Sequence, residues 1–157
     1  MNNNFLNIYN NLIKLTRNKK LYENISNNES FSDRLIMFFF HFAFFLKLFK
    51  KQTSKNNLQD LFDFVFKQIE LSIREIGYGD ASINKKMKGY VNVMYSIIDK
   101  VELWEKLDSS SKSKFFSKFI DADKESAFFV SYFDKYSLYL LKNSFNYFTK
   151  EVISLKF

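Results

Sequence analysis

The chain has few side chains of the types that carry out covalent or metal chemistry. It has one histidine, His41, and no cysteine. A thiolate nucleophile, a disulfide, a zinc–thiolate site and a multi-histidine metal site are therefore excluded. The carboxylates are scattered, and with one histidine they form no recognisable nucleophile–base pair. The sequence thus predicts a protein that is not an enzyme and that uses no metal or cofactor.

All three glycines lie in the stretch LSIREIGYGDASINKKMKGY, residues 71–90. A dinucleotide-binding fingerprint needs G-x-G-x-x-G after a strand, whereas here Ser82 holds the sixth position and a helical pattern precedes. The phosphate-binding pattern G-x-x-x-x-G-K-[ST] is absent as well. We interpret the stretch as a joint between two helices. Gly77 ends the first helix in the left-handed conformation, and Gly79 permits the turn. Asp80 starts the next helix, with Asp80 or Ser82 as its cap.

Charged side chains flank this joint. Arg74 and Glu75 lie in the last turn before it, where they either fix the joint through a salt bridge or contact a partner. Three lysines, Lys85, Lys86 and Lys88, follow it. They either face solvent or contact anionic groups of a ribosome or a membrane.

Composition predicts the elements that position these residues. Proline is absent and glycine is nearly so, which favours long helices with few turns. We expect one domain, residues 1–157, forming an all-α bundle of about five to seven helices. Apolar spacing of three and four residues predicts these helices: 5–17, 33–50 with Ser32 or Asp33 as its cap, 58–76, 80–98, 112–120, and 124 to about 153.

The most apolar stretch, LIMFFFHFAFFL at residues 35–46, is expected to be the central buried helix. Twelve helical residues reach about 18 Å, well short of a bilayer core of about 30 Å. His41 is therefore predicted to be a buried core residue rather than a ligand. Arg34, near the start of the same helix, is expected to pair with Glu75 or Asp80.

Aromatic and basic residues point to a partner surface. The chain has 21 phenylalanines, and the last helix carries six rings that spread over more than one face: Phe128, Phe129, Tyr132, Phe133, Tyr136 and Tyr139. We expect part of this set to form an exposed apolar patch, the usual mark of a partner site. Residues 1–56 hold nine Lys/Arg and three Asp/Glu, a net +6 of the total +7, and should form a basic rim together with Lys85, Lys86 and Lys88.

Around the joint, the sequence strongly resembles a known family. IREIGYGDASINKKMK, residues 73–88, is similar to the L-R-E-x-G-V-G-D…V-x-K-K-x-K signature of the ubiquinol–cytochrome c chaperone family. LFDFVFKQIELSIRE, DRLIMFFFHFAFFLKLFK and YNNLIKLTRNKKLYENI resemble further segments of it. The likeness is strongest over residues 9–98 and is weaker to about Tyr132. Asp33 replaces a family glycine, and Tyr95-Ser96-Ile97 replaces an expected Tyr-Gly-Arg, so one family arginine is missing.

The resemblance implies an all-helical, non-enzymatic assembly chaperone that binds newly made cytochrome b. It also implies work beside the ribosome with a small assembly partner protein. The basic N-terminal third suits peripheral contact with an acidic membrane surface. The expected location is the cytoplasm, at the inner membrane, or the mitochondrial matrix in a eukaryotic host. The opening residues show no pattern of a secretory signal. The alternative is a helical nucleic-acid-binding protein that uses the basic N-terminal third and the joint at residues 77–88.

Overall fold

The computed structural model describes residues 2–23, 31–120 and 126–157. Within these ranges the chain forms six α-helices and three short 3₁₀ helices, and no strand. The elements are α1 (Asn2–Thr16), η1 (Lys19–Leu21), α2 (Phe31–Phe49), α3 (Lys55–Ile76), α4 (Asp80–Glu102), η2 (Trp104–Lys106), α5 (Ser109–Phe119), α6 (Ser126–Leu141) and η3 (Phe145–Thr149). The prediction of an all-α bundle of about five to seven helices is confirmed.

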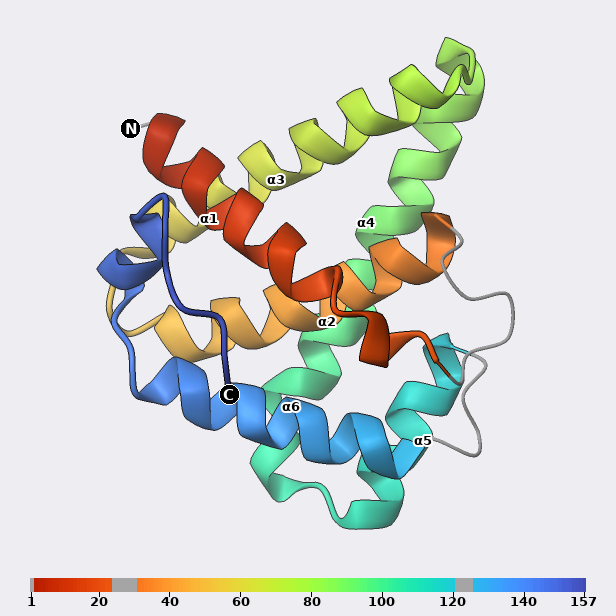
Figure 1. Ribbon diagram of the computed structural model, residues 1–157. Helices are drawn as coiled ribbons and strands as arrows, with labels where there is room; N and C mark the ends of the chain where they lie inside the picture. The colour runs from red at the N-terminus through yellow and green to blue at the C-terminus, as the bar shows by residue number, and fades with distance from the viewer. Residues whose placement is uncertain (1, 24–30, 121–125) are drawn as a thin grey trace.

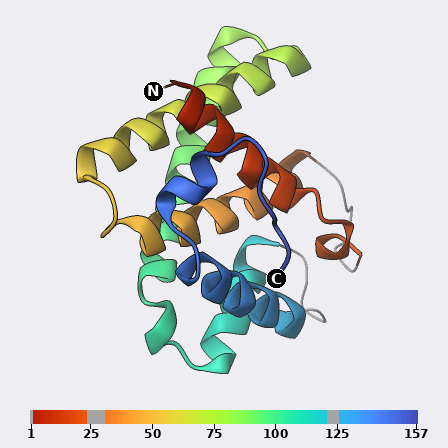
Figure 2. The ribbon, with the colours of Figure 1, turned by 60° about the vertical axis from the view of Figure 1, so that its left-hand side comes forward.

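The apolar helix α2 is the centre of the bundle, as its sequence predicts. It packs against α1, α4 and α6, and Figures 1 and 2 show it enclosed by these helices. An unbroken run from Met37 to Phe45 is buried. Burying apolar surface stabilises the fold, so a helix that is apolar on every side stabilises it most when every side is covered. This explains the central position of α2.

Stacked and edge-to-face rings fill the space between α2, α5 and α6. Phe44 stacks on Phe133 of α6 with ring centroids 5.3 Å apart, and Phe40 meets Phe116 of α5 edge-on at 5.2 Å. Trp104 also packs edge-on against Phe44, and its Nε1 donates to Asp134 Oδ1 at 2.9 Å. The many phenylalanines therefore serve mainly as core.

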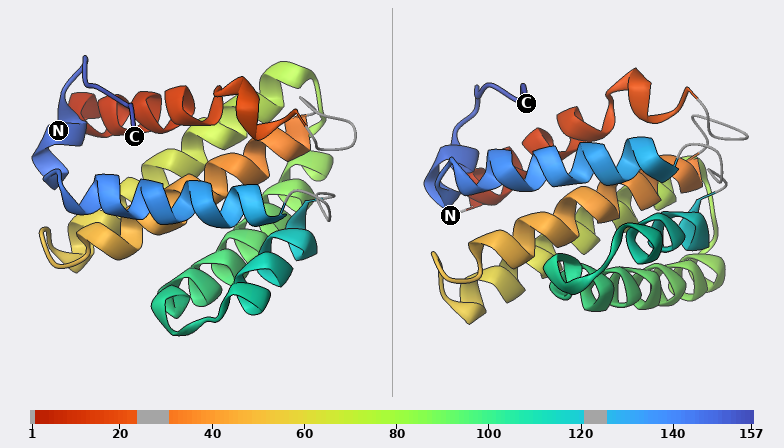
Figure 3. Two further views of the ribbon diagram at one scale, coloured as in Figure 1. Left: turned by 60° about the horizontal axis from the view of Figure 1, so that its bottom comes forward. Right: turned by 90° about the horizontal axis from the view of Figure 1, so that it is seen from below.

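The hairpin of α3 and α4 projects from the body of the bundle. In Figure 1 the two helices rise together to a tip at the upper right, and Figure 3 shows α2 and α6 running side by side below the first helix. The base of the hairpin is fixed to α2, because Lys47 Nζ donates to the carbonyl of Val101 at 2.9 Å and Lys50 pairs with Glu102. At the distal end of the hairpin, residues 74–82 are all exposed.

The last helix is shorter than predicted. The pattern predicts a helix to about residue 153, whereas α6 ends at Leu141. The Asn143 side chain donates to the carbonyl of Tyr139 at 2.8 Å, and Ser144 then caps η3 by accepting from Tyr147 N. Both side chains compete with continued helical hydrogen bonding, so the chain turns here and runs back across α1 and α6 (Figure 2).

Several helix starts also differ by a few residues. The helix α2 begins at Phe31, so Ser32 and Asp33 lie inside its first turn rather than at its cap. The helix α5 begins at Ser109 because Asp108 caps it by accepting from Ser111 N at 2.8 Å. The predicted start of the last helix, at residue 124, lies outside the described residues.

Candidate partner-binding surfaces

The joint between α3 and α4 has the geometry predicted for Gly77. Its φ is 105°, in the left-handed region, and its N–H donates to the carbonyl of Arg74 at 3.0 Å. The predicted cap, Asp80 or Ser82, is wrong, because the N-cap of α4 is Gly79, which has no capping side chain, and Asp80 is the first helical residue. Asp80 instead accepts from Arg74 Nη1 at 2.6 Å, which ties the two helices across the turn.

The predicted pairing of Arg34 with an acid of this joint is also wrong. In the described part of the chain no salt bridge joins Arg34 to Glu75 or Asp80. Arg34 lies instead beside a pocket on α2, while Arg74, only six residues from Asp80, meets that carboxylate locally. Glu75 is exposed at the end of α3.

The tip of the hairpin is apolar and basic. Ile76 is 53% exposed and Tyr78 is 44% exposed. Lys86 Nζ lies 4.5 Å from the centre of the Tyr78 ring, within the range of a cation–π contact. Lys85 and Lys88 are exposed on the first turns of α4. Sequence spacing assigns Ile76 to the apolar face of α3, and it is exposed because the tip extends past the helices that would cover it.

The predicted aromatic surface of α6 is mostly buried. Four of its six members, Phe129, Phe133, Tyr136 and Tyr139, belong to the core. Their burial removes them as contacts for a partner. Phe128, which is 36% exposed, and half-buried Tyr132 remain at the surface, and their rings stack at 6.3 Å.

These two rings line an open groove beside the end of α1. Its volume is about 460 Å³. The ring of Phe157 contributes to it, and four lysines border it: Lys14, Lys20, Lys135 and Lys156. Aromatic rings and lysines meet in this groove, but only Lys14 and Lys20 belong to the predicted basic rim. Lys85, Lys86 and Lys88 lie on the hairpin and are not part of the groove.

His41 lies directly beneath this groove and is fully buried, as predicted. Its Nε2 is 2.7 Å from the hydroxyl of Tyr132, and its Nδ1 is 2.7 Å from the carbonyl oxygen of Met37. Burial lowers the pKa of His41 to about 4, more than the bond to Met37 raises it. The imidazole is therefore neutral at neutral pH and is held in place as part of the core.

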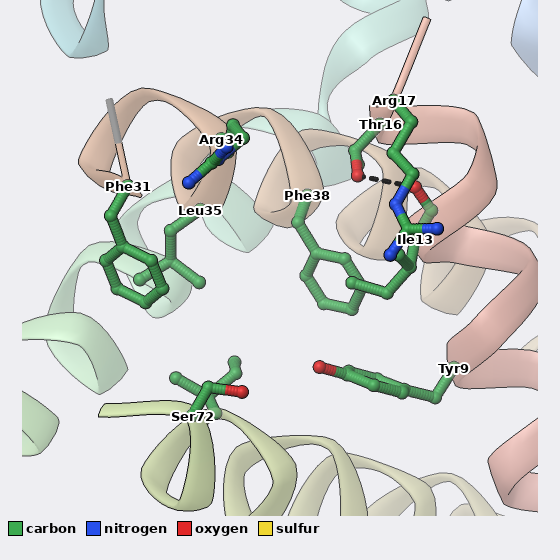
Figure 4. Close-up of a pocket in the computed structure, with 10 residues that line it drawn as sticks. Tyr9, Ile13, Thr16, Arg17, Phe31, Arg34, Leu35, Phe38 and Ser72 are labelled. Atoms are coloured by element: carbon green, nitrogen blue, oxygen red, sulfur yellow. Dashed lines mark hydrogen bonds between the residues drawn. The ribbon is translucent and has the colours of Figure 1, made fainter. Parts of the chain in front are cut away.

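A second hollow lies between α1, α2 and α3, with a volume of about 270 Å³ (Figure 4). Leu35, Phe38 and Ile69 form a buried apolar interior. The hydroxyl of Tyr9 points into the space from α1. Burial raises the pKa of Tyr9, while a hydrogen bond with Ser72 and the charge of Arg17 oppose this rise. We call this space the α1–α2–α3 pocket.

Two further features concern the chemistry of the described residues. Among them, no group of three His, Cys, Asp or Glu side chains is placed to hold a metal ion. Within the same ranges no helix has the length and apolar character needed to cross a bilayer. Among the described residues we consider three candidate surfaces: the hairpin tip, the basic groove and the α1–α2–α3 pocket.

Comparison with known proteins gives one match. The family model described as ubiquinol–cytochrome C chaperone matches residues 23–110, more than half of the 157 residues. Neither the curated proteins nor the solved structures gave a match. The matched range holds α2, α3 and α4 with the glycine joint, while α1 and α6 lie outside it.

Proposed function

Because the chain belongs to the ubiquinol–cytochrome c chaperone family, we propose that it is a non-enzymatic chaperone that binds newly made cytochrome b. The match over residues 23–110 carries this proposal, since it supports a role in the assembly of ubiquinol–cytochrome c reductase. Cytochrome b is an apolar membrane protein, so before assembly it needs cover for its exposed segments. A helical surface with exposed apolar side chains can provide that cover.

The hairpin tip is the surface that we assign to this client. It lies inside the matched range and carries exposed Ile76 and Tyr78. Leu71, 43% exposed, extends the apolar area down α3. The nearby cations Lys85 and Lys88, exposed on α4, favour segments of a membrane protein that end in acidic or polar residues. An arm that projects from the bundle can reach a client without rearrangement of the core.

We assign the basic groove to a different binding partner. Its four lysines give it the charge to meet an anionic surface, and its rings Phe128 and Tyr132 add apolar contact. In this proposal that partner is the ribosome at which cytochrome b is made. The chaperone would then act on the cytoplasmic side of the inner membrane, or in the matrix of a mitochondrion.

The client assignment is tested with the full chain carrying an affinity tag, crosslinked in cells that synthesise labelled cytochrome b. Cytochrome b should be recovered with the wild-type chain. The double variant Ile76→Ser/Tyr78→Ser should recover much less, because it removes apolar contact area without touching the core.

A matched control removes two exposed apolar side chains elsewhere. Leu138 and Leu141 are 58% and 66% exposed on α6, outside the matched range. Leu138→Ser/Leu141→Ser should recover cytochrome b as the wild type does. Equal loss in both variants would refute the hairpin assignment. Recovery of nucleic acid in place of cytochrome b, with a strong dependence on salt, would refute the chaperone proposal itself.

A further inference from the structure

The α1–α2–α3 pocket combines an apolar interior with two arginines at its mouth. Arg17 comes from the residue after α1 and Arg34 from the first turns of α2, and Figure 4 shows them on either side of Phe38. Both side chains are exposed. In the described part of the chain neither forms a salt bridge. Two cations therefore stand at the opening of an apolar space, and no carboxylate of the described residues forms a salt bridge with either.

The interior has the size and lining for an aliphatic chain. An apolar cavity of about 150 Å³ lined by Leu, Ile and Phe is enough to bind benzene. The pocket has about 270 Å³ and is lined by Leu35, Phe38 and Ile69, with Ile13 and Phe31 closer to the opening. A segment of hydrocarbon placed here would cover apolar surface that is otherwise in contact with water.

The hydroxyls of Thr16 and Ser72, which line the pocket, are engaged already. The Thr16 hydroxyl donates to the carbonyl of Ile13 at 2.8 Å, and the Ser72 hydroxyl donates to the carbonyl of Gln68 at 3.1 Å. Few groups remain to bond the amides of a peptide that entered the pocket, and unpaired amides are costly to bury. A hydrocarbon chain needs no such partners, so the lining favours a lipid over a peptide.

We propose that the α1–α2–α3 pocket binds an acidic lipid. The carboxylate or phosphate of the lipid pairs with Arg17 and Arg34, and its aliphatic chain enters between Leu35, Phe38 and Ile69. Arginine suits this role because its planar guanidinium bonds carboxylate and phosphate oxygens in pairs. The site is separate from the hairpin tip, so it stands whether or not cytochrome b is the client.

The test uses cis-parinaric acid, a fatty acid whose fluorescence rises when it is bound, with the full chain. Wild-type protein should bind the probe, and lysophosphatidylglycerol should displace it at lower concentration than lysophosphatidylcholine with the same acyl chain. The variant Arg17→Gln/Arg34→Gln should bind the probe at least about tenfold more weakly, because it loses charge-assisted hydrogen bonds. The control Lys106→Gln/Lys142→Gln removes the same charge at two exposed positions outside the pocket and should bind within about twofold of wild type.

A second variant tests the interior. Ser72→Trp places a large ring in the pocket and should abolish binding of both lysolipids. If circular dichroism shows that this variant is unfolded, Ile13→Trp serves the same purpose from α1. Undiminished binding in the arginine variant, or in a folded pocket-filling variant, would overturn the proposal. Displacement of the probe by an acidic apolar peptide but not by lysophosphatidylglycerol would overturn it too.

The source of the lipid is resolved by flotation with phosphatidylglycerol vesicles. Binding that is lost with Arg17→Gln/Arg34→Gln and kept with Lys106→Gln/Lys142→Gln supports an acidic lipid of the bilayer. Binding of cis-parinaric acid without binding to vesicles supports a free fatty acid in the same pocket. Vesicle binding that falls equally in both variants, with no binding of the probe, would show only general attraction between charges and would overturn the pocket.

Discussion

The ring nitrogen Nε2 of His41 and the hydroxyl oxygen of Tyr132 lie 2.7 Å apart inside the helical bundle. The other ring nitrogen, Nδ1, faces the carbonyl oxygen of Met37, which can only accept. Nδ1 must therefore carry the proton, and in the neutral ring Nε2 accepts the hydrogen bond from Tyr132. This arrangement satisfies a fully buried histidine without any charge. It also joins α2 to α6 beneath the basic groove.

We predict that His41 makes the protein less stable as the pH falls from about 7 to about 5. In the folded protein the pKa of His41 is about 4, below the ordinary value of 6.5. As the pH falls, His41 therefore binds a proton in the unfolded chain before it does so in the folded protein. The contribution of His41 to folding stability is fully present above its pKa in the unfolded chain. It is lost as the pH falls toward its pKa in the folded protein. The free energy of unfolding should drop by about 2 kcal/mol over this range, measured by denaturant titration.

The variant His41→Gln is the control for this pH dependence. Carboxylates titrate mainly below about pH 5, so they contribute little in the window. The curve for His41→Gln should be nearly flat between the two pH values, whatever its overall stability. A wild-type slope that persists in this variant would show that another group is responsible.

We predict that Tyr132→Phe destabilises the fold although it removes a single oxygen. It leaves His41 Nε2 buried without a donor, and this should cost about 1–3 kcal/mol. Tyr95→Phe makes the same chemical change at a ring that is 51% exposed and stacks on Phe62. That control should alter the free energy of unfolding by about 0.5 kcal/mol or less. Equal stability of the two variants in urea would contradict the role of the hydrogen bond.

A third prediction separates the core and surface rings of α6. Phe133→Ala should cost about 3–5 kcal/mol, because the ring is fully buried between Phe40 and Phe44. Phe128→Ala, five residues earlier, should cost far less, since more than a third of that ring is exposed. Thermal unfolding followed by circular dichroism measures both. A large loss in Phe128→Ala would mean that this ring too is core and that the basic groove is not a free surface.

The sequence predicts the helices well because apolar spacing and the glycine joint are local signals. The positions from Leu61 to Ile73 on α3 and the left-handed Gly77 are where the pattern puts them. The end of α6 is missed because apolar Val152 and Ile153 continue the pattern, and only the short polar stretch at residues 142–144 interrupts it.

Contacts between segments that are distant in the sequence cannot be predicted from such local signals. The returning C-terminal segment brings the ring of Phe157 to 5.1 Å from that of Tyr139 and 5.6 Å from that of Tyr136, so a second face of α6 is covered. No spacing in the sequence indicates this. The same holds for Arg34 and Arg17, which share a pocket only because α1 and α2 pack side by side. The candidate sites are therefore mostly products of the tertiary fold.

The last prediction uses one substitution at two glycines. Gly77→Ala should destabilise the protein by about 1–2 kcal/mol, because a side chain strains the backbone at φ 105°. Gly89→Ala should stabilise it by about 0.5–1 kcal/mol, because Gly89 lies inside α4 and alanine is the better helix former. At both positions an added Cβ meets no atom within 4 Å, so crowding plays no part in either effect. Opposite shifts in the urea midpoint of the two variants are expected. Shifts of the same sign would mean that Gly77 does not end α3 in the left-handed conformation in solution, and the geometry of the hairpin tip would have to be revised.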